Sequence, residues 1–221
     1  MSKEITQEFQ QVLPELSKHL EQLKKIVETS GEKLEGNCFY YHQTITPFPE
    51  LLPKQLNLFW AGKGANKICE IGFNAGHSAL LFLLANQHKS PFTFTVFDIV
   101  EHSYTKPTFE YLLYSQPHGT MELFEGDSTV TLPEWISLNE DEKGTYDLVH
   151  VDGGHLEHVI KSDMKYADIL VKPGGIIIID DTNVPFINNE VELYLLTGKY
   201  SELDIFPTVG YEHRILRKQN A

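Results

Sequence analysis

The sequence has little of three things, and each shortage excludes a class of protein. Only two cysteines are present, Cys38 and Cys69, so no disulfide framework is expected, and we infer a reducing, cytoplasmic setting. No apolar run is long enough to span a bilayer and the N-terminus lacks a signal-peptide pattern, so we expect no membrane association. Basic residues are scarce, 18 against 31 acidic ones, and a net charge of -13 without a basic cluster argues against a nucleic-acid-binding protein.

The composition is otherwise that of a soluble globular protein. A hydrophobic content of 41% with 22% charged residues is ordinary for this class, and 221 residues suffice for one α/β domain. No internal repeat, low-complexity segment or linker divides the chain. We therefore expect a single domain over residues 1–221, in which residues 1–48 form a helical extension and cap and residues 49–221 form the core.

The N-terminal region has the pattern of amphipathic helices. Apolar residues recur at helical spacing over residues 4–29, and Pro14 predicts a kink or a break between two helices. These helices could pack on the core or mediate a homo-oligomer. An aromatic segment follows, Phe39-Tyr40-Tyr41-His42, which could cap a ligand pocket or seat the helices on the core.

The stretch Lys67–Leu84 predicts a buried strand that turns through glycine into a helix. The strand is Lys67–Ile71 with Glu70 near its end, the loop is Gly72–Gly76, and the helix opens at Ser78. Such a turn directs backbone N–H groups and the positive end of a helix dipole to one spot, which suits the polar part of a nucleotide-like ligand. The G-x-x-x-G-x-S spacing differs from the G-x-G-x-x-G pattern of dinucleotide-binding turns.

Strands and helices alternate after this stretch. The alternation predicts an α/β fold with a doubly wound, mostly parallel sheet, helices on both faces and an antiparallel pair at one edge. The expected strands are 92–97, 121–125, 146–151, 176–179, 203–207 and 212–217, the last two around Gly210; the expected helices are 50–61, 108–115, 128–138, 156–170 and 191–197, with a turn at 172–175.

Acidic residues fall at the carboxyl ends of the expected strands, where ligands bind in such a sheet. Asp98 ends the second strand, in a position to bond both hydroxyls of a ribose. Asp127 and Ser128, which follow Gly126, could meet an adenine amino group or could cap the next helix.

Three further carboxylates, Asp152, Asp180 and Asp181, follow the two central strands. Like charges this close raise one another's pKa unless a cation lies between them, and hard oxygen ligands suit Mg²⁺. The alternative is that Asp181 caps the following segment and Asp152 bonds backbone at its turn. His155 could accept a hydroxyl proton near neutral pH, or could be an N-cap or polar loop residue before the next helix.

Two sets of residues resemble a known family. The run Glu70-Ile71-Gly72-Phe73-Asn74-Ala75-Gly76-His77-Ser78 resembles the first motif of the Rossmann-like methyltransferases that use S-adenosylmethionine (SAM). The runs VDGGH at 151–155 and IIIDD at 177–181 resemble the metal-dependent O-methyltransferases. That group includes catechol, caffeoyl-coenzyme A and macrocin-type sugar O-methyltransferases. The resemblance covers roughly residues 50–185.

The resemblance implies a Rossmann-like fold, SAM as cofactor, and a Mg²⁺ or Mn²⁺ ion that assists methyl transfer. It also implies a role for each matching residue. The methionine end of SAM would lie at Gly72, Phe73, Asn74, Ala75, Gly76 and Ser78, and Glu70 would support this loop of the cofactor site. The ribose would lie at Asp98 and the adenine at Gly126, Asp127 and Ser128. The metal would be held by Asp152, Asp180 and Asp181; His155 would act as the base, and Asp152 would also take part in catalysis and lie close to SAM.

The substrate expectation follows from a departure within the resemblance. His155 stands where catechol-type enzymes place a Lys base, and a His there is similar to the macrocin-type sugar enzymes. The aromatic gatekeepers for flat phenolic substrates have no clear counterpart. We therefore expect a small polyhydroxylated substrate, a sugar or glycosylated metabolite; the alternatives are a catechol-like phenol, a catalytically silent SAM-binding protein, or an NAD-type oxidoreductase, which the glycine spacing disfavours.

Overall fold

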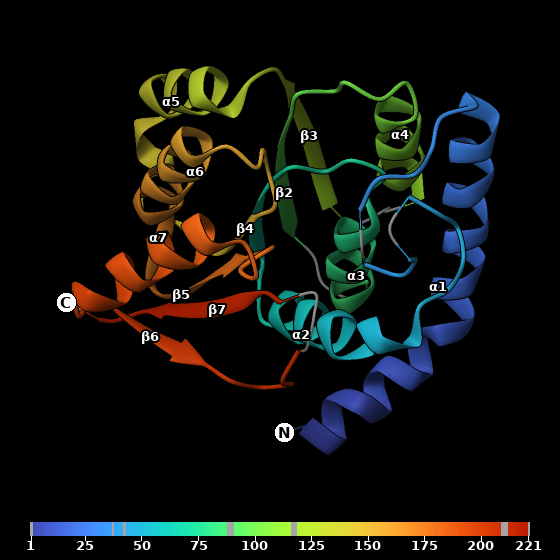
Figure 1. The fold of residues 1–221 in the computed structure, drawn as a ribbon, viewed down its shortest axis with the longest axis horizontal. Helices are drawn as coiled ribbons and strands as arrows, with labels where there is room; N and C mark the ends of the chain where they lie inside the picture. Colours follow the sequence, from blue (N-terminus) through green and yellow to red (C-terminus); the bar gives the residue numbers. More distant parts are fainter. Residues whose placement is uncertain are drawn as a thin grey trace.

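The computed structural model describes residues 2–36, 38–41, 43–87, 91–115, 119–208 and 212–220. Its centre is a seven-stranded sheet in the order β3-β2-β1-β4-β5-β7-β6, with helices on both faces (Figure 1). Strands β1 to β5 pair in parallel, and β7 runs antiparallel to both β5 and β6. The predicted α/β class, parallel sheet and antiparallel edge are confirmed. The strands are β1 Lys67–Ile71, β2 Phe92–Asp98, β3 Gly119–Glu125, β4 Tyr146–Val151, β5 Val171–Ile179, β6 Tyr200–Leu203 and β7 Arg214–Lys218.

Two apolar layers form because successive strand side chains point to opposite faces of the sheet. In β1, Ile68 joins the layer under α1, α2, α3 and α4, whereas Cys69 and Ile71 join the layer under α5, α6 and α7. Cys69 is a fully buried free thiol, as its position in a core strand predicts. The helices are α1 Ser2–Ser30, α2 Leu52–Lys63, α3 His77–Asn86, α4 Thr105–Ser115, α5 Ser128–Leu138, α6 Glu157–Leu170 and α7 Pro185–Leu196, with short 3-10 turns at Pro49–Leu51 and Glu140–Glu142.

The N-terminal region is one helix, α1, and not two. Pro14 lies inside it, and the helix bends on its way along the domain (Figure 1). Proline removes one backbone hydrogen bond and its ring crowds the preceding turn, which bends a helix. The helix continues because apolar residues on both sides of the bend, among them Phe9 and Leu23, are buried against the same domain. The apolar face is thus used within the chain, and a homo-oligomer through α1 stays a prediction.

Other bounds differ from the prediction for identifiable reasons. Helix α7 begins at Pro185 and not at residue 191, because proline is well suited to the first helical position. Residues 172–175, predicted as a turn, continue β5 through a bulge, since Tyr146 pairs with Val171 and Leu148 already pairs with Ile176. The edge strands are β6 and β7 in place of 203–207 and 212–217, and Gly210 lies outside the described residues.

The aromatic segment before the core packs on α3. The rings of Phe39 and Tyr40 are buried and meet the ring of His77 edge-on at 5.7 and 5.4 Å between centroids. Tyr41 is exposed, and His42 lies outside the described residues. Within the part of the chain that the structure describes, no helix has the length and apolarity needed to traverse a bilayer.

The order of the strands fixes where a ligand can bind. The chain passes from β1 outward to β2 and β3, then returns to β4 beside β1 and continues to β5 on the other side. The segments that leave β1 and β4 therefore diverge from each other, and such a switch point is where ligands bind in an open α/β sheet. Gly72 follows β1 and Asp152 follows β4, so both lie at this point.

Candidate active site

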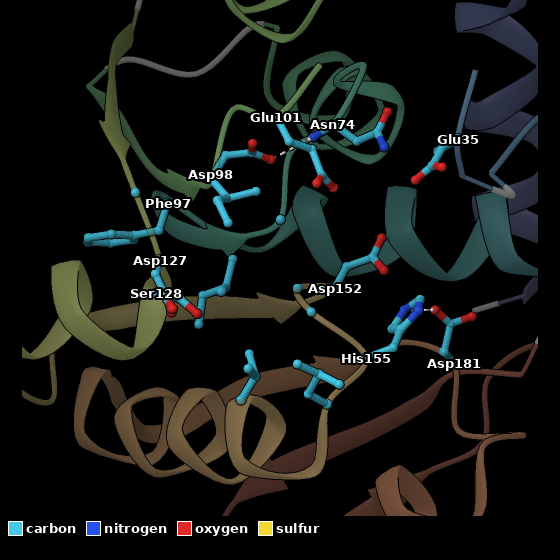
Figure 2. A pocket seen from close by; sticks show the side chains of 18 of the residues that line it. Glu35, Asn74, Phe97, Asp98, Glu101, Asp127, Ser128, Asp152, His155 and Asp181 are labelled. Carbon is cyan, nitrogen blue, oxygen red and sulfur yellow. Dashed lines mark hydrogen bonds and ion pairs between the residues drawn. The ribbon is translucent and has the colours of Figure 1, made fainter. Parts of the chain in front are cut away.

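A cavity of about 600 Å³ opens at the carboxyl ends of β1, β2 and β4 (Figure 2). A much smaller one, of about 30 Å³, lies behind the glycine loop. Most predicted site residues line one of the two. The large cavity takes Gly72, Asn74, Asp98, Gly126, Asp127, Ser128, Asp152, His155 and Asp181, the small one takes Phe73, Asn74, Ala75, Ser78 and Asp152, and Glu70, Gly76 and Asp180 line neither.

The glycine loop needs glycine at both ends for steric reasons. Gly72 has φ +89°, and a Cβ there would lie 1.9 Å from the backbone oxygen of Asp152. Gly76 has φ +74°, and a Cβ there would lie 2.5 Å from the ring of Phe73. Both backbone conformations are ones that only glycine adopts without strain. The loop can therefore pass close to β4 and bring α3 to the cavity.

Two buried carboxylates hold this loop. Glu70 lies under it, where its Oε1 accepts from Ser78 Oγ at 2.6 Å and contacts His150 Nδ1 at 2.9 Å. Burial raises the pKa of Glu70. Asp98 accepts two backbone N–H groups of the loop, from Phe73 at 2.7 Å and Asn74 at 2.9 Å. The sequence predicted the support by Glu70 but not this second role of Asp98.

Asp127 caps helix α5, which is one of its two predicted alternatives. Its Oδ1 accepts from the backbone N–H of Thr129 at 2.9 Å, and Asp127 is the N-cap residue. It still lines the cavity together with Gly126 and Ser128. Capping therefore does not remove these residues from the site, and their contact with an adenine stays a prediction.

The three predicted metal carboxylates do not form a single group among the described residues. Asp180 is buried and forms an ion pair with the buried Lys54 of α2. Asp181 instead contacts His155, with 2.6 Å between Oδ2 and Nε2 (Figure 2). Asp152 lies between them. Its carboxylate lies within 4.8 Å of possible metal-ligand atoms of His150 and Asp180 in one group, and of His155 and Asp181 in a second group. The carboxylates thus form two groups that share Asp152.

Electrostatics in these groups follow from burial and from the neighbouring charges. Burial and Asp180 raise the pKa of Asp152 well above its usual range. Burial also opposes the ionisation of Asp180, but the Lys54 ammonium outweighs it and holds the pKa of Asp180 below its usual range. The hydrogen bond with Asp181 raises the pKa of His155. A proton that reaches His155 is therefore stabilised by a carboxylate.

The N-cap alternatives for His155 and Asp181 are wrong, whereas the alternative of a polar loop residue before α6 agrees with the position of His155. Leu156, not His155, is the N-cap of α6, and Val184, not Asp181, is the N-cap of α7. The sequence analysis missed Lys54 altogether. A usable signal was present, because Lys54 stands at helical spacing from Leu51 and Leu58 within the helix predicted over 50–61, which places it on the apolar face. The structure shows Lys54 buried on this face.

Comparison with known proteins places this site in a family. A family model described as a methyltransferase domain matches residues 69–182, more than half of the 221 residues. The matched residues include the glycine loop and the three carboxylates Asp152, Asp180 and Asp181. The chain therefore belongs to the methyltransferase domain family. No curated protein matches the chain in sequence.

Solved structures show the same fold at low sequence identity. An O-methyltransferase from Bacillus cereus in complex with SAH, the demethylated product of SAM, is 17% identical, with coverage of 92% and 91% of the two chains and a TM-score of 0.63. A TDP-rhamnose 3'-O-methyltransferase of calicheamicin biosynthesis is 15% identical (92% and 94%, TM-score 0.61). The O-methyltransferase of tomaymycin synthesis from Streptomyces achromogenes, in complex with SAM, is 16% identical (92% and 90%, TM-score 0.60). The chain has the fold of these O-methyltransferases.

Proposed function

We propose that this protein is a SAM-dependent O-methyltransferase that methylates a hydroxyl of a small polyhydroxylated molecule, a sugar or a glycosylated metabolite. One observation carries the proposal. His155, which is paired with the Asp181 carboxylate, lies at one end of the large cavity. The glycine loop and Asp98 line the other end of the same cavity. A base is thus placed beside a site suited to a nucleoside cofactor.

The cavity suits SAM in size and in the groups that line it. Its volume of about 600 Å³ is in the range of small-molecule sites. We assign the methionine end to the loop Gly72–Gly76 before α3, the ribose to Asp98, and the adenine to the segment Gly126–Ser128. The carboxylate of Asp98 uses some of its lone pairs on the loop, and a carboxylate has further sites that can accept ribose hydroxyls.

The reaction assigned to His155 is removal of the acceptor's hydroxyl proton. As the hydroxyl oxygen attacks the SAM methyl carbon, the bond from that carbon to sulfur breaks and the sulfur leaves as a neutral thioether. The neutral imidazole takes the hydroxyl proton, and Asp181 stabilises the imidazolium that results. Such a transfer needs no covalent enzyme intermediate, and holding the oxygen in line with the methyl group supplies much of the acceleration.

We include a divalent cation in the proposal because one carboxylate oxygen of Asp180 has no hydrogen-bond partner among the described residues. Oδ1 of Asp180 is buried without a hydrogen-bond partner among the described residues, although Oδ2 is engaged by Lys54. Asp152, Asp180 and Asp181 would hold Mg²⁺ or Mn²⁺, which prefer such oxygens. When bound, the ion would lower the pKa of the acceptor hydroxyl.

The test is methyl transfer from radiolabelled SAM to a panel of sugars and polyols, with and without a chelator. His155→Gln should lower turnover by about 10²- to 10⁴-fold, the usual contribution of a general base. Lys165→Gln, an exposed change on α6, is the control and should leave turnover unaltered. Normal turnover in His155→Gln would refute the assigned base, and binding of SAM without transfer to any acceptor would favour a silent SAM-binding protein.

A further inference from the structure

Three neighbouring strands bring polar side chains to one buried place. In a strand, side chains two residues apart point to the same face of the sheet. Glu70 of β1 pairs in register with His150 of β4, which pairs in turn with Ile178 of β5. Asp152 and Asp180 each come two residues later in the chain, and the alternation directs both to this same face. A row of polar groups therefore lies under the helices at the carboxyl end of the sheet.

The imidazole of His150 has one ring nitrogen that no neighbour explains. The side chain is 1% exposed, and its ring meets the ring of Phe82 in α3 edge-on, with 5.5 Å between centroids. Its Nδ1 lies 2.9 Å from Oε1 of Glu70. Because a carboxylate accepts hydrogen bonds, Nδ1 carries the ring proton and Nε2 presents a lone pair. That Nε2 is buried and has no hydrogen-bond partner among the described residues.

A second unpartnered atom lies close to His150. Oδ1 of Asp180 is buried without a hydrogen-bond partner in the described part of the chain, whereas Oδ2 is engaged by Lys54. Possible metal-ligand atoms of His150, Asp152 and Asp180 all lie within 4.8 Å of one another. Buried polar atoms are normally paired, so the lone pairs of His150 and Asp180 point to a shared ligand.

The charges around this group favour a cation as that ligand. Three carboxylates, Glu70, Asp152 and Asp180, face the single ammonium of Lys54. Three negative charges against one positive charge leave two when all are ionised, and one divalent cation balances both. Buried charges are stable only when they are paired or coordinate a metal. The small cavity of about 30 Å³, which Lys54, His150 and Asp152 help to line, provides room beside them.

We propose that His150 is a metal ligand, which together with Asp152 and Asp180 holds the divalent ion of the proposed function, and that this ion is Mn²⁺ in preference to Mg²⁺. The inference rests on the proposed function, whose ion it identifies. An imidazole nitrogen suits transition-metal ions, whereas Mg²⁺ favours oxygen ligands. Glu70 on Nδ1 is the supporting carboxylate that a metal-bound histidine normally has.

The first test asks whether the nitrogen of His150 binds the ion. Mn²⁺ is added to the protein, and pulsed electron paramagnetic resonance detects nitrogen coupled to the bound manganese. The wild type should show this coupling. His155 lies in the other group that shares Asp152, so His155→Asn is the matched control and should keep the coupling, whereas His150→Asn should lose it. The asparagine amide can take the place of Nδ1 and bond Glu70, so this variant removes Nε2 with little other change.

The second test compares affinities by calorimetry. The wild type should bind Mn²⁺ about tenfold or more tightly than Mg²⁺. His150→Asn should weaken Mn²⁺ binding by at least about tenfold, since even the loss of a group that supports a metal ligand costs this much. His155→Asn should bind Mn²⁺ as the wild type does.

The inference is overturned by no Mn²⁺ binding, by equal affinities for the two ions, by the absence of nitrogen coupling, or by coupling that persists in His150→Asn. Coupling that disappears in His155→Asn overturns it as well, and this result is decisive even where His150→Asn does not fold. Neither measurement needs methyl transfer. A protein that binds Mn²⁺ through His150 but methylates no acceptor would refute the proposed function alone, and one that methylates without nitrogen coupling would refute this inference alone.

Discussion

Removing the buried charge of Lys54 should destabilise the fold far more than breaking a surface ion pair. In Lys54→Met the Asp180 carboxylate loses its ammonium partner and stays buried beside Asp152. Both side chains of the Lys54–Asp180 pair are at most 4% exposed. Removing one partner of a buried pair costs about 3–5 kcal/mol. The exposed pair between Lys161 and Glu157, at 54% and 64% exposure, contributes at most about 1 kcal/mol.

The assay is urea unfolding at pH 7 in the presence of a chelator, so that no metal ion replaces the ammonium. With a denaturant slope of about 2–3 kcal/mol per molar, the Lys54→Met midpoint should fall by about 1–2 M. Lys161→Met is the surface control. Lys54→Met/Asp180→Asn removes both charges and should recover most of the loss. A Lys54→Met cost below about 1 kcal/mol, or a double variant whose cost equals the sum of the single ones, would refute the ion pair as described.

Three further predictions concern pH and the glycine loop. Burial lowers the pKa of His77 to about 4, so on acidification its imidazole is protonated in the unfolded chain before it is protonated in the folded one. The free energy of unfolding should therefore be at its full value above about pH 6.5 and fall by about 3 kcal/mol towards pH 4. Denaturant unfolding at several pH values should show a smaller fall in His77→Phe. Because the pKa of His155 is raised and its base form is neutral, kcat/KM should rise with pH to a midpoint above 6.5, and Asp181→Asn should move that midpoint to lower pH; an unchanged pH profile would contradict the pairing. Gly72→Ala should abolish SAH binding in calorimetry, because its Cβ would lie 1.9 Å from a backbone oxygen, whereas Gly64→Ala, with nothing within 4 Å, should bind normally.

The parts of the fold that the sequence predicts well are those with local signals. The bounds of β4, Tyr146–Val151, match the prediction because Gly144 and the run Asp152–Gly154 punctuate an apolar segment on either side. The glycine loop is likewise predicted from residues adjacent in the chain. The start of α7 and the bulge in β5 were missed, because a proline or a glycine pair can either end an element or be accommodated within it.

The parts that could not be predicted depend on partners distant in the sequence. Lys54 and Asp180 are 126 residues apart, and Glu32, whose carboxylate accepts from the backbone N–H of Ser103, is 71 residues from it. Helical or strand periodicity reports which face of an element is apolar, but it does not report which residue of another element meets that face. The three aspartates were therefore predicted as one group, since the lysine that engages one of them was not foreseen.

Among the described residues, the large cavity is lined by six carboxylates and by no Lys or Arg, and this charge has a consequence for turnover. In the proposed reaction the sulfonium of SAM would enter with a positive charge, and after methyl transfer the same sulfur would be neutral. A cavity with acidic walls therefore attracts the sulfonium of the cofactor more strongly than the thioether of the product. The charge difference favours replacement of spent product by fresh cofactor, and added salt weakens this bias because it screens the walls. The carboxylates of the cavity would thus set the direction of cofactor exchange.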